Sequence, residues 1–159
     1  MPKAGKTLYL TFDDGPHPDI TPRVLALLEQ YNAKATFFCI GDRVKRYPEV
    51  YKAILEAGHT VGNHTQHHVK GSKISLERYL ADVDLAAEYI NSRLFRPPYG
   101  RMTSSQERAI LVKGYQIVMW TILSADYNKN LSKDEVSKRA CSAISVSYTH
   151  LTLPTNREV

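Results

Sequence analysis

Short β-like runs alternate with amphipathic helical segments along most of this chain. The pattern is clearest over residues 76–90, where apolar side chains recur every three or four positions and Ser75 is placed to cap a helix. A strand, a helix and a second strand in this order form a parallel pair joined by a crossover, so the sequence predicts an α/β fold on a parallel sheet. The expected strands are 7–12, 35–40, 59–62, 94–96 and 116–120, and the expected helices are 21–30, 48–57, 76–90, 105–113 and 134–144.

The length and charge of the chain limit the function classes that fit it. Its 159 residues are enough for one core but fewer than the roughly 200–250 of a complete α/β barrel. The net charge of +5 comes from scattered Lys and Arg, and no basic run alternates with aromatic residues, so nucleic-acid binding is not expected. We also expect no membrane segment and no signal peptide in this chain, because its apolar runs are short and its N-terminus has no apolar core.

Residues 146–159 do not continue the pattern that precedes them. They resemble an in-frame translation of the transposon-end adapter used to prepare sequencing libraries, which is not a natural protein sequence. We therefore expect a truncated native domain at 1–145 and a non-native, adapter-derived tail at 146–159, so that the expected fold comprises residues 1–145.

Three clusters of chemically active residues follow three of the expected strands. They are Thr11–Gly15 with the adjacent carboxylates Asp13 and Asp14, then His64–His68, and then Arg96–Gly100. The carboxyl ends of parallel strands meet at one edge of a sheet, so the clusters are predicted to be neighbours in space. Asp and His are ligands suited to zinc and similar divalent ions, and a spare carboxylate can act as a base. The clusters together predict a metal-assisted hydrolase.

Each cluster taken alone has a simpler interpretation. Asp13 and Asp14 precede Gly and Pro, and all these residue types favour turns. His64 and His68 share one face if their segment is helical, but a solvated His-rich loop fits them as well. Arg96 stands before two prolines and is equally typical of a surface cation on a stiff loop. Because side chains alternate along a strand, the two carboxylates are expected to point in different directions and to do different jobs.

Jointly, the clusters resemble the motifs of the polysaccharide deacetylase family, also called the NodB-homology domain or carbohydrate esterase family 4. The likeness extends from about Lys6 to Asp126. It implies a distorted, incomplete (β/α) barrel that lacks its last strand and helix. The implied roles are general base for Asp13, metal ligand for Asp14, His64 and His68, orientation of the base for Arg96, and oxyanion binding for the backbone N–H of Tyr99.

The chain departs from the family pattern in two places. Its fourth motif keeps Asp126, whose family role is to tune the general acid, but has Tyr127 where members commonly have Trp. Tyr127 still offers an aromatic wall for a sugar. The fifth motif, an apolar strand that ends in the general-acid histidine, has no counterpart before residue 146, and His150 lies in the suspected tail. We therefore expect the chain to bind metal but to turn over slowly.

The resemblance implies an enzyme that removes N-acetyl groups from N-acetylglucosamine-containing polysaccharide, either peptidoglycan or chitin-like oligomers. The implied cofactor is a divalent metal, first zinc, with cobalt, manganese or nickel as alternatives. Two other functions stay open: a small-amide hydrolase on the same scaffold, and a non-catalytic glycan-binding module with a vestigial metal site. A glycan is the expected partner. The family implies a cell-envelope or extracellular location, which the chain itself does not reveal.

Overall fold

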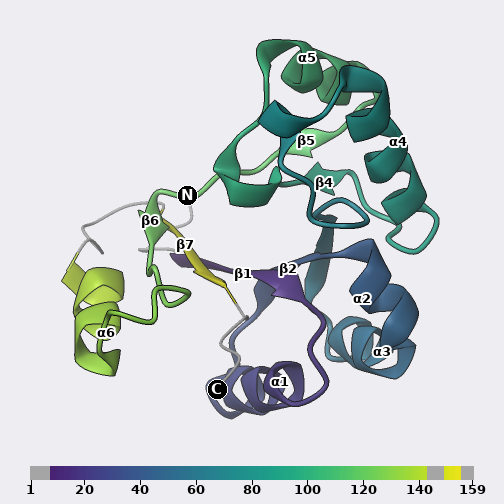
Figure 1. Cartoon of the computed structure of the whole chain (residues 1–159). Coiled ribbons are helices and arrows are strands. Elements are labelled where there is room, and N and C mark those ends of the chain that lie inside the picture. Colours follow the sequence, from purple (N-terminus) through teal and green to yellow (C-terminus); the bar gives the residue numbers. More distant parts are fainter. Residues whose placement is uncertain (1–7, 143–148, 155–159) are drawn as a thin grey trace, which may run out of the picture.

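All strand pairings are parallel in the computed structural model, which describes residues 8–142 and 149–154 (Figure 1). The strands are β1 Leu8–Gly15, β2 Ala35–Cys39, β3 Thr60–Asn63, β4 Leu94–Phe95, β5 Gln116–Ile117, β6 Ile122–Leu123 and β7 Thr149–Pro154. The helices are α1 Ile20–Gln30, α2 Gly41–Arg46, α3 Pro48–Glu56, α4 Leu76–Ala87, α5 Ser104–Val112 and α6 Lys133–Ser142, with short 3-10 turns at Gly71–Lys73 and Pro98–Gly100.

The sheet is curled rather than flat. Its strand order is β5-β4-β3-β2-β1-β7-β6, so β5 and β6 are the two edges. Residues 118–121 alone connect them, and the five Cα steps from Ile117 to Ile122 reach at most about 18 Å. The six spacings of a flat sheet would hold the edges about 29 Å apart. The edges must therefore approach each other, and α1 to α5 follow one another around the outside (Figure 1). The predicted α/β architecture of barrel type is confirmed.

Two apolar clusters fill the space between the strands and the helices. The larger joins β1, β2 and β3 to α1, α3 and α4, with Phe37 and Ile54 fully buried in it. The smaller lies among α4, α5 and β4, where Tyr79, Phe95 and Ile110 are fully buried. Strand β2 is buried almost throughout, as its continuous apolar sequence predicted. No described helix offers the length of apolar sequence that a membrane crossing requires.

The boundaries differ from the sequence expectation where tertiary contacts decide them. Helix α1 begins at Ile20, one residue before the expected start at Thr21, whose hydroxyl accepts the N–H of His17 at 2.9 Å. Helix α2 was not expected at all. It has six residues and no side-chain cap, and its first two amides, of Gly41 and Asp42, donate instead to carbonyls of a distant loop.

Residues 149–154 lie in the sheet as β7, between β1 and β6. Leu8 to Asp13 pair in register with Thr149 to Pro154. Parallel pairing needs only main-chain donors and acceptors in an extended segment, so it does not reveal where a sequence comes from. The adapter origin of 146–159 is a statement about origin and stays a prediction. Residues 143–148 and 155–159 lie outside the described part of the chain.

Candidate metal centre and active site

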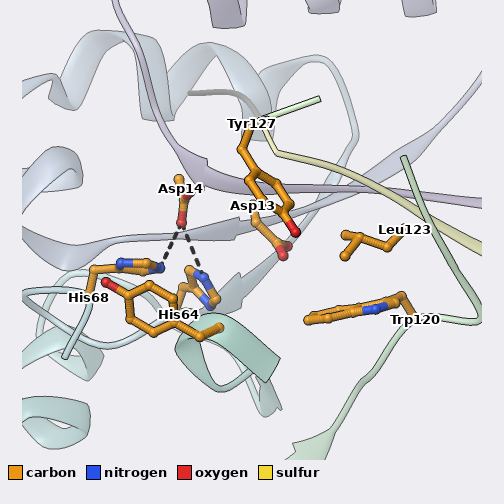
Figure 2. A pocket seen from close by; sticks show the side chains of 8 residues that line it. Asp13, Asp14, His64, His68, Trp120, Leu123 and Tyr127 are labelled. Atoms are coloured by element: carbon orange, nitrogen blue, oxygen red, sulfur yellow. Dashed lines mark ion pairs between the residues drawn. The ribbon is translucent and has the colours of Figure 1, made fainter. Parts of the chain in front are cut away.

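The three clusters converge at the carboxyl ends of β1, β3 and β4. Asp13 and Asp14 lie at the end of β1, His64 directly follows β3, and Arg96 directly follows β4. With aromatic side chains from later in the chain, the carboxylates and two histidines line a cavity of about 300 Å³, here called the active cavity (Figure 2). The topology thus brings together residues more than 80 positions apart, such as Asp13 and Arg96.

Strand β1 continues through both carboxylates instead of ending in the turn that the sequence favoured. Its register with β2 shifts between Asp13 and Gly15, and Asp14 has a φ of 66°. This irregularity is a β-bulge, which re-aims the side chains next to it. As a result Asp13 and Asp14 both line the active cavity, but they contact different partners.

The two histidines reach Asp14 through a tight turn, not through a helix. Thr65 and His68 have left-handed φ values of 64° and 55°. The Nε2 atoms of His64 and His68 lie 3.2 and 3.1 Å from Oδ1 of Asp14, with the two ring centroids 5.1 Å apart. Figure 2 shows both rings pointing toward the carboxylate. His67 points elsewhere, to Asp82 on α4.

The arrangement around Asp14 fits a divalent cation. The Nδ1 of His64 lies 2.7 Å from the carbonyl oxygen of Arg96. A carbonyl can only accept, so Nδ1 carries the proton and, in a neutral ring, Nε2 presents a lone pair to Asp14. Within the described part of the chain, Asp14 Oδ1 is buried and accepts no hydrogen bond. Acceptors that face one another are costly without a positive charge between them.

The types and spacing of the ligand atoms also fit a divalent cation. One ligand atom from each of Asp14, His64 and His68 lies within 4.8 Å of the other two. One carboxylate oxygen and two imidazole nitrogens suit zinc and related first-row cations, and three protein ligands leave positions open.

Asp13 is held by a buried arginine. Nη1 of Arg96 donates to Oδ1 of Asp13 at 2.7 Å and to the hydroxyl of Thr11 at 2.8 Å. The guanidinium is fully buried and also donates to the carbonyls of Val118 and Met119 at 2.9 and 3.2 Å. Arg96 is therefore an internal scaffold for the base candidate rather than a surface cation.

Burial and neighbouring charges move the two carboxyl groups in opposite directions. Burial raises the pKa of Asp13 above its usual value, although the charges of His64 and Arg96 oppose the rise. Burial would also raise the pKa of Asp14, but where His64 and His68 are protonated, as without a bound cation, their positive charge outweighs it and holds that pKa well below its usual range. Neighbouring carboxyl groups with separated pKa values are typical of sites that divide acid–base and ligand roles.

Apolar and aromatic side chains form the rest of the wall of the active cavity, namely Tyr99, Trp120, Leu123 and Tyr127. Figure 2 shows Trp120 and Leu123 on the side away from the two histidines. The structure places the two tyrosines that were singled out from the sequence, Tyr99 and Tyr127, in this wall. Trp120 and Leu123 were not assigned to the site. Gly100 is the sequence signal that could have pointed to Trp120. Its φ is 62°, and a Cβ at Gly100 would clash with the indole ring of Trp120.

Asp126 is not among the described residues that line the cavity. Its carboxylate accepts a hydrogen bond from the hydroxyl of Ser124 at 2.9 Å.

A second cavity, of about 530 Å³, lies beside α1 and before β2 and β3, at the amino ends of the strands. This amino-end cavity has a mostly aliphatic lining with Glu29, Lys34 and His59. His59 is buried and its Nδ1 accepts the N–H of Ala35 at 3.3 Å, while Lys34 Nζ donates to the carbonyl of Ala57 at 2.6 Å. Its two basic side chains are therefore bound to main chain.

Comparison with known proteins gives a consistent result. The polysaccharide deacetylase family model matches residues 1–118. A peptidoglycan-N-acetylglucosamine deacetylase of Bacillus cereus is 41% identical over 126 residues, which cover 76% of this chain and 59% of that protein. A chitooligosaccharide deacetylase of Azorhizobium caulinodans is 34% identical over 130 residues, covering 76% of this chain and 61% of that protein. The chain thus spans less than two thirds of each relative.

A similar fold occurs in a solved structure, peptidoglycan deacetylase PdaC from Bacillus subtilis. It superposes with a TM-score of 0.85 at 28% identity, over 96% of this chain and 76% of that one. The likeness therefore covers almost the whole chain.

Proposed function

The chain belongs to the polysaccharide deacetylase family, and on that premise we propose that it is a metal-dependent hydrolase of N-acetyl groups on N-acetylglucosamine-containing polysaccharide, peptidoglycan or chitin-like oligomers. The observation that carries this proposal is the union, in one cavity, of the Asp14–His64–His68 cluster with the buried Asp13–Arg96 pair. The names of two relatives, a peptidoglycan-N-acetylglucosamine deacetylase and a chitooligosaccharide deacetylase, support the substrate class.

Asp14, His64 and His68 would hold the cation. A divalent metal bound there would polarise a carbonyl oxygen and lower the pKa of a water molecule. Zinc suits this ligand set best, and cobalt, manganese and nickel are the alternatives.

Asp13 is the proposed general base. Its raised pKa brings proton uptake closer to neutral pH than for an exposed carboxylate, as a base in the deprotonation of an attacking water requires. Arg96 orients this carboxylate through the 2.7 Å contact and cannot itself release a proton near neutral pH.

The proposed oxyanion donor is the backbone N–H of Tyr99. This residue has a φ of 60° in the turn after β4, and its ring packs 4.6 Å from the ring of His68. A donor fixed before the reaction stabilises developing negative charge without reorganisation.

The leaving amine also needs a proton. Among the residues whose side chains the structure describes, the histidines that line the active cavity are the two proposed ligands. Asp126 is the proposed tuner of an acid, which those residues do not supply. We therefore propose slow turnover by this chain.

The substrate is proposed to lie against the wall formed by Tyr99, Trp120, Leu123 and Tyr127, where aromatic faces stack on the apolar faces of sugar rings. A cell-envelope or extracellular location is proposed because peptidoglycan and chitin-like polymers occur there.

The test is acetate release from acetylated chitooligosaccharides and from peptidoglycan by the whole chain, with zinc and after chelation. We expect slow release that stops on chelation and returns with zinc, and that is absent in Asp14→Ala. The matched control is Asp42→Ala, which removes a half-exposed carboxylate that pairs with Arg46 on α2. Release that survives chelation would contradict the proposal.

Glycan binding that is independent of metal and without acetate release would favour the binding module, and hydrolysis restricted to small amides would favour the other alternative.

A further inference from the structure

We propose that Asp82 on α4 is a positioning residue that fixes the loop between the two histidine ligands and thereby presents His68 to the metal. The inference rests on the proposed metal centre, but Asp82 itself does not line the active cavity and contacts none of the three ligand side chains.

The carboxylate of Asp82 holds the loop by three contacts. Its Oδ2 accepts the backbone N–H groups of Gln66 and His67, each at 3.0 Å, and the N–H of Gln66 also donates to the main-chain carbonyl of Asp82 at 3.1 Å. Its Oδ1 accepts from Nδ1 of His67 at 2.6 Å. The side chain of Asp82 is only 10% exposed, whereas that of His67 is 56% exposed, so the carboxylate itself is largely removed from water. Hydrogen bonds to a charged acceptor are stronger than neutral ones.

The loop needs such a holder because its backbone is strained. Thr65 and His68 both have left-handed φ values, a conformation that is unfavourable for residues other than glycine. Without external contacts the segment would relax, and the ring of His68 would turn away from Asp14. Asp82 contacts the two residues that lie between these strained positions.

The two ligands are secured unequally. The side chain of His64 is 3% exposed and its ring is oriented by the carbonyl of Arg96. The side chain of His68 is 25% exposed, packs against Tyr99, and within the described residues its Nδ1 makes no hydrogen bond. The direction of the His68 ring is therefore set by its backbone, which Asp82 controls.

The opposite side of the loop is held by α2. The N–H groups of Gly41 and Asp42 donate to the carbonyls of Thr65 and Gln66, both at 3.0 Å. A Cβ at Gly41 would clash with the side chain of Gln66 and would lie 3.0 Å from the Cα of Ala86, so glycine allows this close approach. Carbonyls of the loop thus bind one helix, and its N–H groups bind the carboxylate of another.

Helix α4 is itself locked to the strand that precedes the loop. The side-chain amide of Asn63 donates to the carbonyl of Val83 at 3.0 Å, and its oxygen accepts the N–H of Thr65 at 2.8 Å. Asp82, the neighbour of Val83, is therefore held in a fixed position relative to the loop. The carboxylate is placed by a rigid element, which is what a positioning residue requires.

The experiment compares Asp82→Ala with Asp84→Ala in the whole chain. Asp84 lies one position beyond Val83 on α4, is 55% exposed and binds Lys113 at 2.8 Å, so its removal leaves the loop unchanged. Three properties are measured: the dissociation constants for Zn²⁺ and Co²⁺, the visible absorption of the Co²⁺-loaded protein, and hydrogen exchange of the amides of residues 66–68 without metal.

For Asp82→Ala we expect affinity for both ions to fall about 10–100-fold, the usual cost of losing a group that orients a metal ligand. The Co²⁺ absorption should change, and the loop amides should exchange faster. Asp84→Ala should match the wild type in all three. Because Asp82→Asn keeps an oxygen acceptor, it should fall between the wild type and Asp82→Ala, and it carries the test if Asp82→Ala does not fold. His67→Ala should stay near the wild type because the main-chain contacts remain.

Wild-type affinity and an unchanged Co²⁺ spectrum in Asp82→Ala would overturn the inference, even if the variant melts at a lower temperature. A wild-type chain that binds neither ion would instead overturn the proposed metal centre. The two failures are therefore distinguishable.

Discussion

The two cavities differ in how their polar side chains are bound. The active cavity measures about 300 Å³ and gathers two carboxylates and two imidazoles, whereas the amino-end cavity is larger, about 530 Å³, and mostly aliphatic. Among the described residues, the cluster of potential metal ligands, Asp14, His64 and His68, lies in the smaller cavity. Convergent polar groups rather than volume therefore mark the site.

The difference follows from how each cavity satisfies its polar atoms. In the amino-end cavity, His59 and Lys34 bind main-chain groups and so stabilise the connections before β2 and β3. In the active cavity, Asp14 Oδ1 is buried without a hydrogen bond from the described residues. A polar atom left in that state is expensive unless a ligand completes it.

The largest expected effect is on turnover in the active cavity. Asp13→Asn removes the proposed base but keeps the side-chain volume, so acetate release should fall about 10²–10⁴-fold. Affinity for zinc should stay near the wild type because Asp13 is not a proposed ligand. Asp42→Asn is the matched control and should leave both unchanged. Undiminished turnover in Asp13→Asn would remove Asp13 from the mechanism.

The next effect is on stability and separates the cations of the two cavities. Arg96→Met removes the guanidinium that pairs with the buried Asp13 carboxylate, and we expect a loss of about 3–5 kcal/mol in the free energy of unfolding. Lys34→Met, which removes one hydrogen bond to a carbonyl at the other cavity, should cost only about 1 kcal/mol. Urea unfolding of both variants measures the difference.

The double variant Asp13→Asn with Arg96→Met tests the cause of that loss. It removes both charges and should recover part of the stability that Arg96→Met alone loses. No recovery would show that packing against Phe38 and Trp120, not the unpaired charge, dominates the role of Arg96.

A smaller effect is expected at the aromatic wall. Tyr127→Ala should raise KM for an acetylated oligosaccharide about three- to tenfold by loss of stacking, with metal affinity unchanged. Tyr31→Ala is the control, because Tyr31 is a more exposed tyrosine that lines neither cavity. Equal KM values for both variants would place the sugar elsewhere.

The smallest effect concerns pH and the amino-end cavity. Burial and the charge of Lys34 lower the pKa of His59 below its usual value. The unfolded chain then binds more protons, so stability should fall as pH drops through the unfolded pKa of about 6.5. His59→Asn keeps an acceptor for the N–H of Ala35 but does not titrate, and should flatten the dependence of the unfolding free energy between pH 7 and 5. An unchanged slope would contradict this assignment.

Much of the architecture could be predicted because its signals are local. Periodic apolar residues and Ser75 predict α4, and Ser75 does accept the N–H of Arg78. Strand β5 begins where the sequence predicted it but ends at Ile117 instead of Trp120, and β6 was not expected, because so short a strand depends on its neighbours rather than on its own pattern. Likewise, β7 pairs with the backbone of β1 over its whole length, so β7 also depends on a neighbouring strand.

The site shows the same division. The sequence by itself determined which chemistry is available, because Asp13, Asp14, His64, His68 and Arg96 follow strands whose carboxyl ends must share one edge of a parallel sheet. Only the tertiary structure decided how those groups are used. Three features depend on contacts between segments far apart in sequence, which no local preference encodes. They are the bulge at Asp14, the left-handed turn of the loop between His64 and His68, and the hydrogen bonds from that loop to Asp82.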